Sequence, residues 1–176
     1  WAVAASSYDI WGSRDSFRFV NFTFSGDVTV EMKVDAFEGR PTDGWKASWA
    51  KGGLMIRDNM GRGSRHYSLF VTGGNGLANQ WREFENGNSG HSKTHNDNPR
   101  PVWLQVKKVG DYFTSAFKYD EEGSQWIPFG QPKTMAFSSE FSVGIAVASN
   151  SWGNSVTLRG SDLSIEEVQT ATTTTE

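Results

Sequence analysis

The nine residues from Val28 to Ala36 alternate between apolar and polar side chains. Successive side chains of a β-strand point to opposite faces of the sheet, whereas an α-helix would distribute the same side chains around its axis. The stretch therefore predicts a strand with one face in a core and the other in water. The expected inward residues are Val28, Val30, Met32, Val34 and Ala36, and the expected outward residues are Thr29, Glu31, Lys33 and Asp35.

A second strand is predicted where paired glycines lead into Leu54-Met55-Ile56-Arg57. An apolar run this short, with glycine before it and Asp58 after it, fits a buried strand better than a helix. Leu54 and Ile56 are expected in the core, while Met55 and Arg57 share the opposite face. The paired glycines indicate either a close approach of two backbones or a bulge.

Similar short runs, separated by turn residues, continue along the chain. The glycine-rich segment 73–76 predicts a hairpin, and the longest loops are expected at 38–48 and 85–100. About ten strands without a convincing amphipathic helix predict an all-β, two-sheet antiparallel β-sandwich or jelly roll. The other expected strands are 16–24, 66–72, 77–84, 102–109, 112–119, 126–130, 141–149 and 156–168, with a change of parity near Gly160.

The composition limits what this chain can be. Its 176 residues suit one domain, and eight Trp and twelve Phe supply material for one core. A formal net charge of −3 gives no reason to expect nucleic acid as a partner, and no apolar run is long enough to span a membrane. Because Cys is absent, disulfides, thiolate metal sites and a cysteine nucleophile are excluded.

One domain is expected over residues 1–168, followed by a Thr-rich tail at 169–176. That tail has the composition of a linker or glycosylated stalk, and equally of a disordered terminus. No signal peptide is visible, and the chain begins without Met, so processing or excision from a longer protein is expected. The sequon Asn21-Phe22-Thr23 adds weak support for secretion.

Five segments of the chain form a recognisable pattern, in this order: Asp9-Ile10-Trp11-Gly12, Trp49-Ala50-Lys51-Gly52-Gly53-Leu54-Met55-Ile56-Arg57, Gln80-Trp81-Arg82, Pro101-Val102-Trp103-Leu104 and Val143-Gly144-Ile145-Ala146-Val147-Ala148-Ser149. Together, these segments resemble the concanavalin A-like jelly rolls. The most similar branch is the laminin-G-like accessory domain attached to bacterial glycosidases, which is related to the regulation-of-enolase type. The likeness covers roughly residues 8–168 and implies a two-sheet sandwich that recognises carbohydrate or glycoconjugates.

No catalytic constellation is found in the sequence. Glycoside hydrolysis uses two carboxyl groups across a cleft, and the Glu-x-Asp-x-x-Glu strand of the glucanases that this chain resembles is missing. Glu31, Asp35 and Glu38 come nearest, but they read as the solvated face of a strand. We therefore expect a module without enzymatic activity, and a glycosidase or polysaccharide lyase with an unrecognised site remains the alternative.

Sugar recognition needs flat aromatic faces and side chains that hydrogen-bond hydroxyl groups. Trp49 and Trp81 read more readily as core residues, and Arg57 has the alternative of pairing with Asp58 or Asp9. His66, at a strand start, is expected to be structural. The predicted ligand-binding residues are Trp45, Arg57, Gln80, Arg82, Asn150 and Trp152.

A metal site is only weakly indicated, and no cofactor is expected to be required. His91 and His95 lie in a loop with Asp97, whose oxygen atoms would suit calcium. A solvated polar loop is the simpler interpretation. Structural calcium stays open, with Asp162 as a further candidate by position alone.

These observations predict a non-catalytic carbohydrate-binding or adhesion module of a larger secreted or surface protein. Its expected partner is a carbohydrate or glycoprotein ligand. The expected location is extracellular or at the cell surface, with the cytoplasm left open. A structural or protein-interaction spacer domain is a further alternative.

Overall fold

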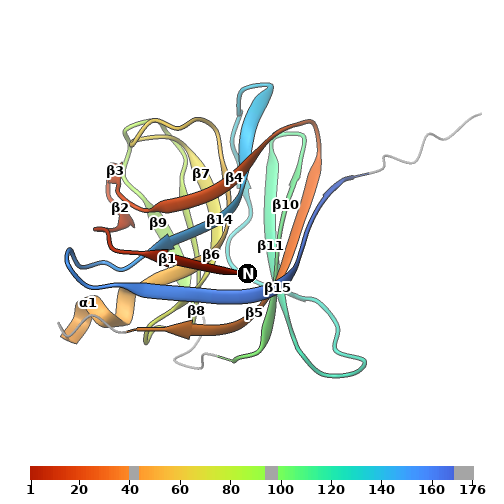
Figure 1. Cartoon of the computed structure of the whole chain (residues 1–176). Coiled ribbons are helices and arrows are strands. Elements are labelled where there is room, and N and C mark those ends of the chain that lie inside the picture. Colours follow the sequence, from red (N-terminus) through yellow and green to blue (C-terminus); the bar gives the residue numbers. More distant parts are fainter. Residues whose placement is uncertain (40–43, 94–98, 169–176) are drawn as a thin grey trace, which may run out of the picture.

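The computed structural model describes residues 1–39, 44–93 and 99–168, which form two antiparallel sheets packed face to face (Figure 1). The seven-stranded sheet has the order β1-β15-β5-β10-β11-β12, and β13 also pairs with β11. Its strands are β1 (Ala2–Ala5), β5 (Val28–Glu38), β10 (Val102–Val109), β11 (Tyr112–Tyr119), β12 (Ile127–Pro128), β13 (Lys133–Thr134) and β15 (Val156–Glu167).

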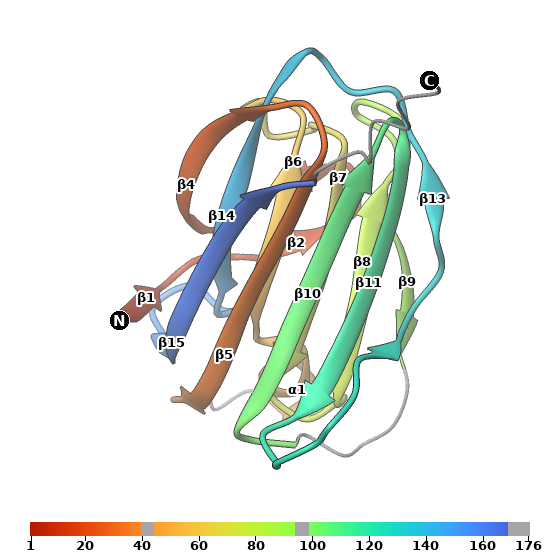
Figure 2. The ribbon, with the colours of Figure 1, turned by 90° about the vertical axis from the view of Figure 1, so that its right-hand side faces the viewer.

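The six-stranded sheet lies behind the first one in Figure 2 and has the order β4-β14-β6-β7-β8-β9. Its strands are β4 (Arg18–Ser25), β6 (Lys51–Arg57), β7 (His66–Thr72), β8 (Leu77–Arg82), β9 (Gly90–Lys93) and β14 (Glu140–Ala148). The prediction of an all-β antiparallel sandwich is confirmed.

The core lies between the sheets and has the parity that the sequence predicts. Leu54 and Ile56 of β6 pack there with Val30 and Met32 of β5 and Leu104 of β10, and all five side chains are fully buried. This face-to-face burial of alternate side chains holds the sandwich together.

The alternation in β5 breaks near its end. Arg159 of β15 pairs with Ala36, whereas Gly160 pairs with Val34, so Asp35 forms a bulge. The bulge shifts the parity by one residue, and Phe37 is buried where Ala36 had been expected. The expected change of parity near Gly160 is confirmed.

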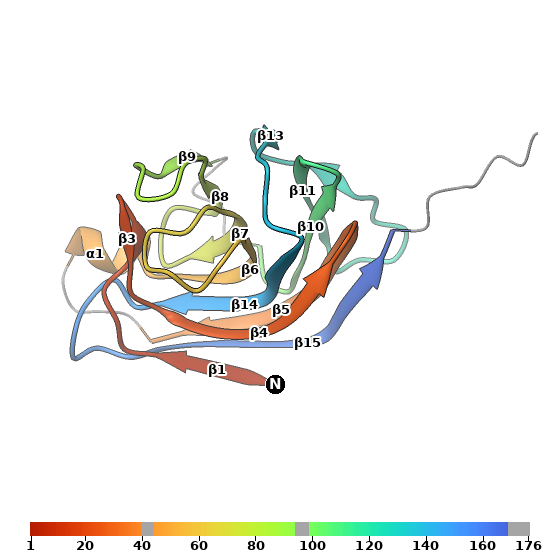
Figure 3. The same cartoon turned by 90° about the horizontal axis from the view of Figure 1, so that it is seen from above.

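The other face of the six-stranded sheet, the outer face, is covered near one end by the N-terminal segment. The short strands β2 (Ile10–Trp11) and β3 (Arg14–Asp15) pair with each other, and Ile10 packs on Met55, Phe70 and Ala146 in a second apolar cluster. In Figure 3, β1 runs alongside β15, so the same segment also joins the seven-stranded sheet. Ala146 and Ala148 of β14 belong to the same apolar cluster, so these small residues allow close packing of the N-terminal segment on the sheet.

Two expected loops contain regular structure. The described part of the first loop holds α1 (Gly44–Trp49), a helix of six residues that leads into β6. The second holds β9, which pairs with β8 although Gly90-His91-Ser92-Lys93 has no apolar alternation. The strand expected over 77–84 ends at Arg82, and Phe84 is exposed.

Candidate functional site

A buried carboxylate fixes the N-terminal segment onto the outer face. Asp15 Oδ2 accepts hydrogen bonds from Arg57 Nη1 at 2.6 Å and Arg82 Nη1 at 2.7 Å, and Asp15 Oδ1 accepts one from Arg82 Nη2 at 2.6 Å. All three side chains are almost fully buried. Burial alone would raise the pKa of Asp15, but the hydrogen bond from Arg82 and the charges around it hold that pKa below its ordinary value.

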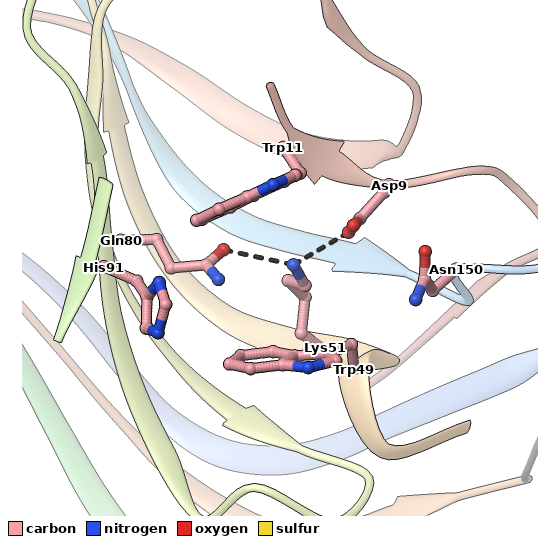
Figure 4. A pocket seen from close by; sticks show the side chains of 7 residues that line it. All are labelled: Asp9, Trp11, Trp49, Lys51, Gln80, His91 and Asn150. Atoms are coloured by element: carbon pink, nitrogen blue, oxygen red, sulfur yellow. Dashed lines mark hydrogen bonds and ion pairs between the residues drawn. The ribbon is translucent and has the colours of Figure 1, made fainter. Parts of the chain in front are cut away.

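A second buried cation, Lys51, lies on the same face and meets the same N-terminal segment. Its Nζ lies 2.7 Å from Asp9 Oδ1 and donates to Gln80 Oε1 at 3.1 Å (Figure 4). It also donates to the Ile10 carbonyl at 3.4 Å. Burial lowers the pKa of Lys51, and the charge of Asp9 opposes that shift. The ammonium group is therefore held in place and electrically balanced.

Two indole rings stand on either side of Lys51. Its Nζ is 6.0 Å from the centroid of the Trp11 ring and 5.6 Å from that of the Trp49 ring. The His91 ring makes edge contacts with both, at centroid distances of 5.3 Å to Trp11 and 5.4 Å to Trp49. In Figure 4 the two rings form opposite walls of one space.

That space is a pocket of about 220 Å³. It is smaller than the clefts of roughly 300–1,000 Å³ that take drug-sized ligands, and it suits one small ring. The residues that line it are Asp9, Trp11, Trp49, Lys51, Gln80, His91 and Asn150 (Figure 4).

The wall formed by Trp49 is positioned by the hairpin between β7 and β8. Gly74 N donates to the Ser48 carbonyl at 3.1 Å, and Asn75 Nδ2 donates to the same oxygen at 2.9 Å. A Cβ at Gly73 would lie 1.9 Å from the Ala47 carbonyl oxygen, so glycine is needed for the end of α1 to approach the hairpin. The hairpin and the helix thus place Trp49 together.

The pocket combines apolar faces with polar groups of both kinds. Indole faces favour the C–H surface of a ring, while Asp9, Gln80 and Asn150 offer hydrogen-bond acceptors and donors. The paired charges of Lys51 and Asp9 leave no large net charge between them. The arrangement suits an uncharged ring that carries hydroxyl groups.

The structure brings some of the predicted ligand-binding residues to this pocket and places others elsewhere. Gln80 and Asn150 line it, whereas Arg57 and Arg82 are buried against Asp15 on the same face. Trp152 is exposed and packs on Tyr8. Trp45 lies in α1, and its side chain is outside the described residues.

The candidate metal ligands are dispersed. His91 lies in the pocket, Asp162 lies in the seven-stranded sheet, and His95 and Asp97 fall outside the described residues. Within residues 1–39, 44–93 and 99–168, no three or more His, Cys, Asp or Glu side chains gather closely enough to hold a metal ion. No helix in this described part is long and apolar enough to cross a membrane.

Five residues that line the pocket were not among the predicted ligand-binding residues: Asp9, Trp11, Trp49, Lys51 and His91. A usable signal was present, because Lys51 shares strand parity with Arg57 and therefore the same face of β6. Asp9 and Trp11 had been used only as part of the fold resemblance, and Trp49 had been interpreted as a core residue.

The fold is shared with many solved structures at low sequence identity. A functionally unknown protein from Saccharomyces cerevisiae matches with a TM-score of 0.67 at 15% identity, over 96% of this chain and 88% of that one. The carbohydrate-binding module CBM66 from Bacillus subtilis matches with a TM-score of 0.54 at 18% identity, over 93% of this chain and 95% of that one. A mutant of the GH43 protein BlXynB from Bacillus licheniformis matches with a TM-score of 0.60 at 12% identity, over 95% of this chain and 33% of that one.

A legume lectin-like domain and alginate lyases are also among the structures that match. No protein-family model matches the chain, and no curated protein matches its sequence. At such low identities the matches show the fold alone, an antiparallel β-sandwich of the jelly-roll type. Binding modules and enzymes both have this fold, so the structural matches do not show whether this protein is a binding module or an enzyme.

Proposed function

We propose that the protein is a non-catalytic carbohydrate-binding module whose pocket holds one neutral sugar unit between Trp11 and Trp49. The observation that carries the proposal is the pair of indole walls on either side of Lys51, with polar side chains at the pocket's edge. A sugar ring presents C–H groups on its faces and hydroxyl groups around its rim. It can therefore stack on the rings while its hydroxyls bond Asp9, Gln80 and Asn150.

Binding fits the pocket better than hydrolysis does. Glycoside hydrolysis uses two carboxyl groups roughly 5–10 Å apart, one of which delivers or removes a proton. Among the described residues that line the pocket, Asp9 is the one that carries a carboxylate, and it is held by the ammonium group of Lys51 at 2.7 Å. A second carboxylate would have to come from outside this set.

The proposal is tested by titrating the protein against a broad panel of neutral glycans in a calorimeter, with and without calcium. We expect binding to at least one sugar, and we expect Trp11→Ala to weaken it at least tenfold, as loss of one stacking wall corresponds to about 1.4 kcal/mol. Trp103→Ala is the matched control, because Trp103 lies on β10 of the other sheet. A panel without any binding would contradict the proposal, as would unaltered binding by a folded Trp11→Ala variant.

A second candidate, a polysaccharide lyase, is favoured by the position of His91. Elimination of a uronate unit needs a base and a group that offsets the carboxylate charge of the substrate. His91 is paired with Gln80 across β8 and β9, and the ammonium group of Lys51 lies in the same pocket. Incubation with alginate and other polyuronates, followed by ultraviolet absorbance of the unsaturated product, tests this. We expect no unsaturated product. If the parent protein formed such a product and the His91→Ala variant did not, lyase activity would replace the first proposal.

The wider setting is also a proposal. We infer a module of a secreted or surface protein with a glycan or glycoprotein partner, of the laminin-G-like branch that the sequence resembles. The sequon is compatible with this, because it lies on β4 at the edge of the six-stranded sheet, where Asn21 is partly accessible and Thr23 is exposed. If no glycan of the panel bound to the protein, the alternative of a spacer domain would be favoured.

A further inference from the structure

Two exposed aromatic rings lie next to the pocket without being part of it. Tyr8 is 56% exposed and Trp152 is 63% exposed, and their ring centroids are 5.4 Å apart with planes tilted by 39°. Tyr8 directly precedes Asp9, and Trp152 follows Asn150 by two positions. Because consecutive Cα atoms are about 3.8 Å apart, this aromatic pair begins within a few ångströms of the pocket residues.

The backbone beneath the pair is held by a buried serine cluster. Ser149 Oγ donates to the Ser7 carbonyl at 2.8 Å and accepts from Ser7 N at 2.9 Å. Ser151 N donates to the same Ser7 carbonyl at 3.1 Å. All three serines are buried, so the segment before Tyr8 and the loop before Trp152 are fixed to each other.

The loop itself has an uncommon backbone conformation. Asn150 has a φ of 55°, a left-handed conformation that residues other than glycine seldom adopt, and Gly153 has a φ of 84°. Such conformations persist where surrounding contacts impose them, often at ligand sites. The serine cluster supplies those contacts on the Ser149–Ser151 side.

Two large aromatic side chains that are exposed and in contact with each other form a contiguous apolar patch, and such a patch beside a pocket can mark a ligand-binding groove. In Figure 4, His91 closes the space between the indole walls on one side, whereas Asp9 and Asn150 bound it on the other. A ligand longer than one ring would extend past Asp9 and Asn150. Tyr8 and Trp152 are the large aromatic residues nearest in the chain to Asp9 and Asn150, and they contact each other.

We propose that Tyr8 and Trp152 form a second subsite, which stacks on the sugar unit next to the one in the pocket. This inference rests on the proposed function and specifies the ligand as a neutral oligosaccharide of at least two units. The pocket supplies selection of one unit through Asp9, Gln80 and Asn150. The aromatic pair supplies additional affinity with little selectivity, because any sugar ring offers a C–H face.

The test is a series of calorimetric titrations with neutral gluco-, manno-, galacto- and xylo-oligosaccharides of one to four units. We expect the sugar that the protein binds to gain up to about tenfold in affinity between one and two units. Trp152→Ala should remove that gain while leaving the affinity for the single unit unchanged. Tyr8→Phe should keep it, because the ring face remains.

The outcomes separate the two proposals. Trp11→Ala should weaken both the one-unit and the two-unit ligand, because it removes a pocket wall. Binding of single sugars with no gain at two units, or a gain that survives in Trp152→Ala, would overturn the second subsite and leave the pocket standing. No binding of any sugar would overturn both. Because Trp152 is exposed, circular dichroism should show an unchanged fold in its variant.

Discussion

Asp15 is the centre of a buried cluster of charges on the outer face. One carboxylate engages two guanidinium groups, from Arg57 and Arg82, at distances of 2.6–2.7 Å. Removing one partner from a buried ion pair is far more harmful than the pair itself is favourable, because the remaining charge cannot be solvated. Arg57 and Arg82 therefore act on the pocket indirectly: they bind Asp15 and so hold the N-terminal segment that carries Asp9 and Trp11.

Asp15→Asn is expected to lower the free energy of unfolding by about 3–5 kcal/mol, because it leaves two buried arginines without a counter-charge. Urea denaturation measures this. Glu38→Gln is the control, since the pair Glu38–Arg159 is about half exposed, with 53% and 52% of the side chains accessible, and should contribute at most about 1 kcal/mol. Equal effects of the two substitutions would contradict the role of burial.

His66 gives the stability a dependence on pH. Its side chain is fully buried, Nδ1 lies 3.0 Å from Ser68 Oγ, and Nε2 has no hydrogen-bond partner among the described residues. Burial lowers the pKa of His66 to about 3, although the charge of Asp15 opposes that shift. The folded protein therefore keeps this imidazole neutral at pH values where an unfolded chain would protonate it.

We accordingly expect stability to fall as the pH drops below about 6.5, the pKa of an unfolded histidine, and to go on falling toward pH 3. The loss has an upper bound of about 1.4 kcal/mol per pH unit, or roughly 2 kcal/mol at pH 5. The lowered pKa of Asp15 acts only below its ordinary value of 3.8, so the two contributions separate. Urea midpoints between pH 7 and pH 5 should decline in the parent protein and stay nearly level in His66→Gln. A level profile in both would contradict the assignment.

Strand β6 shows how two adjacent glycines can have different roles. Gly53 lies on the outer face, where an added Cβ would be 2.1 Å from the Leu69 carbonyl oxygen and 2.8 Å from Phe70 Cα. Gly52 faces the core, where the added atom would be 3.2 Å from the Leu158 methyl groups. Backbone cannot move away within a paired sheet as easily as a side chain can rotate.

Gly53→Ala should therefore destabilise the fold by about 3 kcal/mol, the upper end for overpacking, while Gly52→Ala should cost about 1 kcal/mol. Both substitutions add one methyl group, at neighbouring positions, so each variant is the control for the other in chemical denaturation. Equal losses would show that the close approach of β7 to β6 is not what requires glycine at position 53.

Periodicity predicted the central strands well and the edge strands poorly. The strands expected at 102–109 and 112–119 have those bounds, because alternate apolar residues face one core. β1 is made of Ala and Val, and β9 is made of Gly, His, Ser and Lys, so both depend on pairing with β15 and β8. Their sequences carry little strand signal of their own.

The site was predictable only to the level of a face. Strand parity places Lys51 with Arg57 on β6 and Gln80 with Arg82 on β8. Lys51 was nevertheless not predicted as a ligand-binding residue, whereas Gln80 and Asn150 were. Which cation meets a ligand depends on where the N-terminal segment crosses the sheet and where Asp15 lies. That is a tertiary contact, over 42 positions to Arg57 and 67 to Arg82, and no local pattern encodes it.

The described residues form two apolar clusters with different roles. One fills the space between the sheets, and the other fixes Ile10 against Met55, Phe70 and Ala146 beneath the pocket. Damage to the first should affect stability alone, whereas damage to the second should also affect binding.

Ile10→Ala and Leu104→Ala test this division, since both side chains are fully buried. Each should cost about 2–5 kcal/mol of unfolding free energy. At a temperature where both variants are folded, Ile10→Ala should also weaken sugar binding severalfold, because Asp9 and Trp11 flank the emptied position. Leu104→Ala should bind sugar like the parent protein. Equal affinities in calorimetry would contradict the separation.

The direction of β15 has a practical consequence. The strand begins at Val156, just after the loop of Asn150 and Trp152, and runs for twelve residues toward the opposite end of the molecule (Figure 1). At about 3.3 Å per residue its far end lies roughly 35 Å from its start. A biotin attached at the far end of β15 would therefore lie far from the loop of Asn150 and Trp152, so that a sensor chip that holds the biotin would leave the pocket accessible to the analyte.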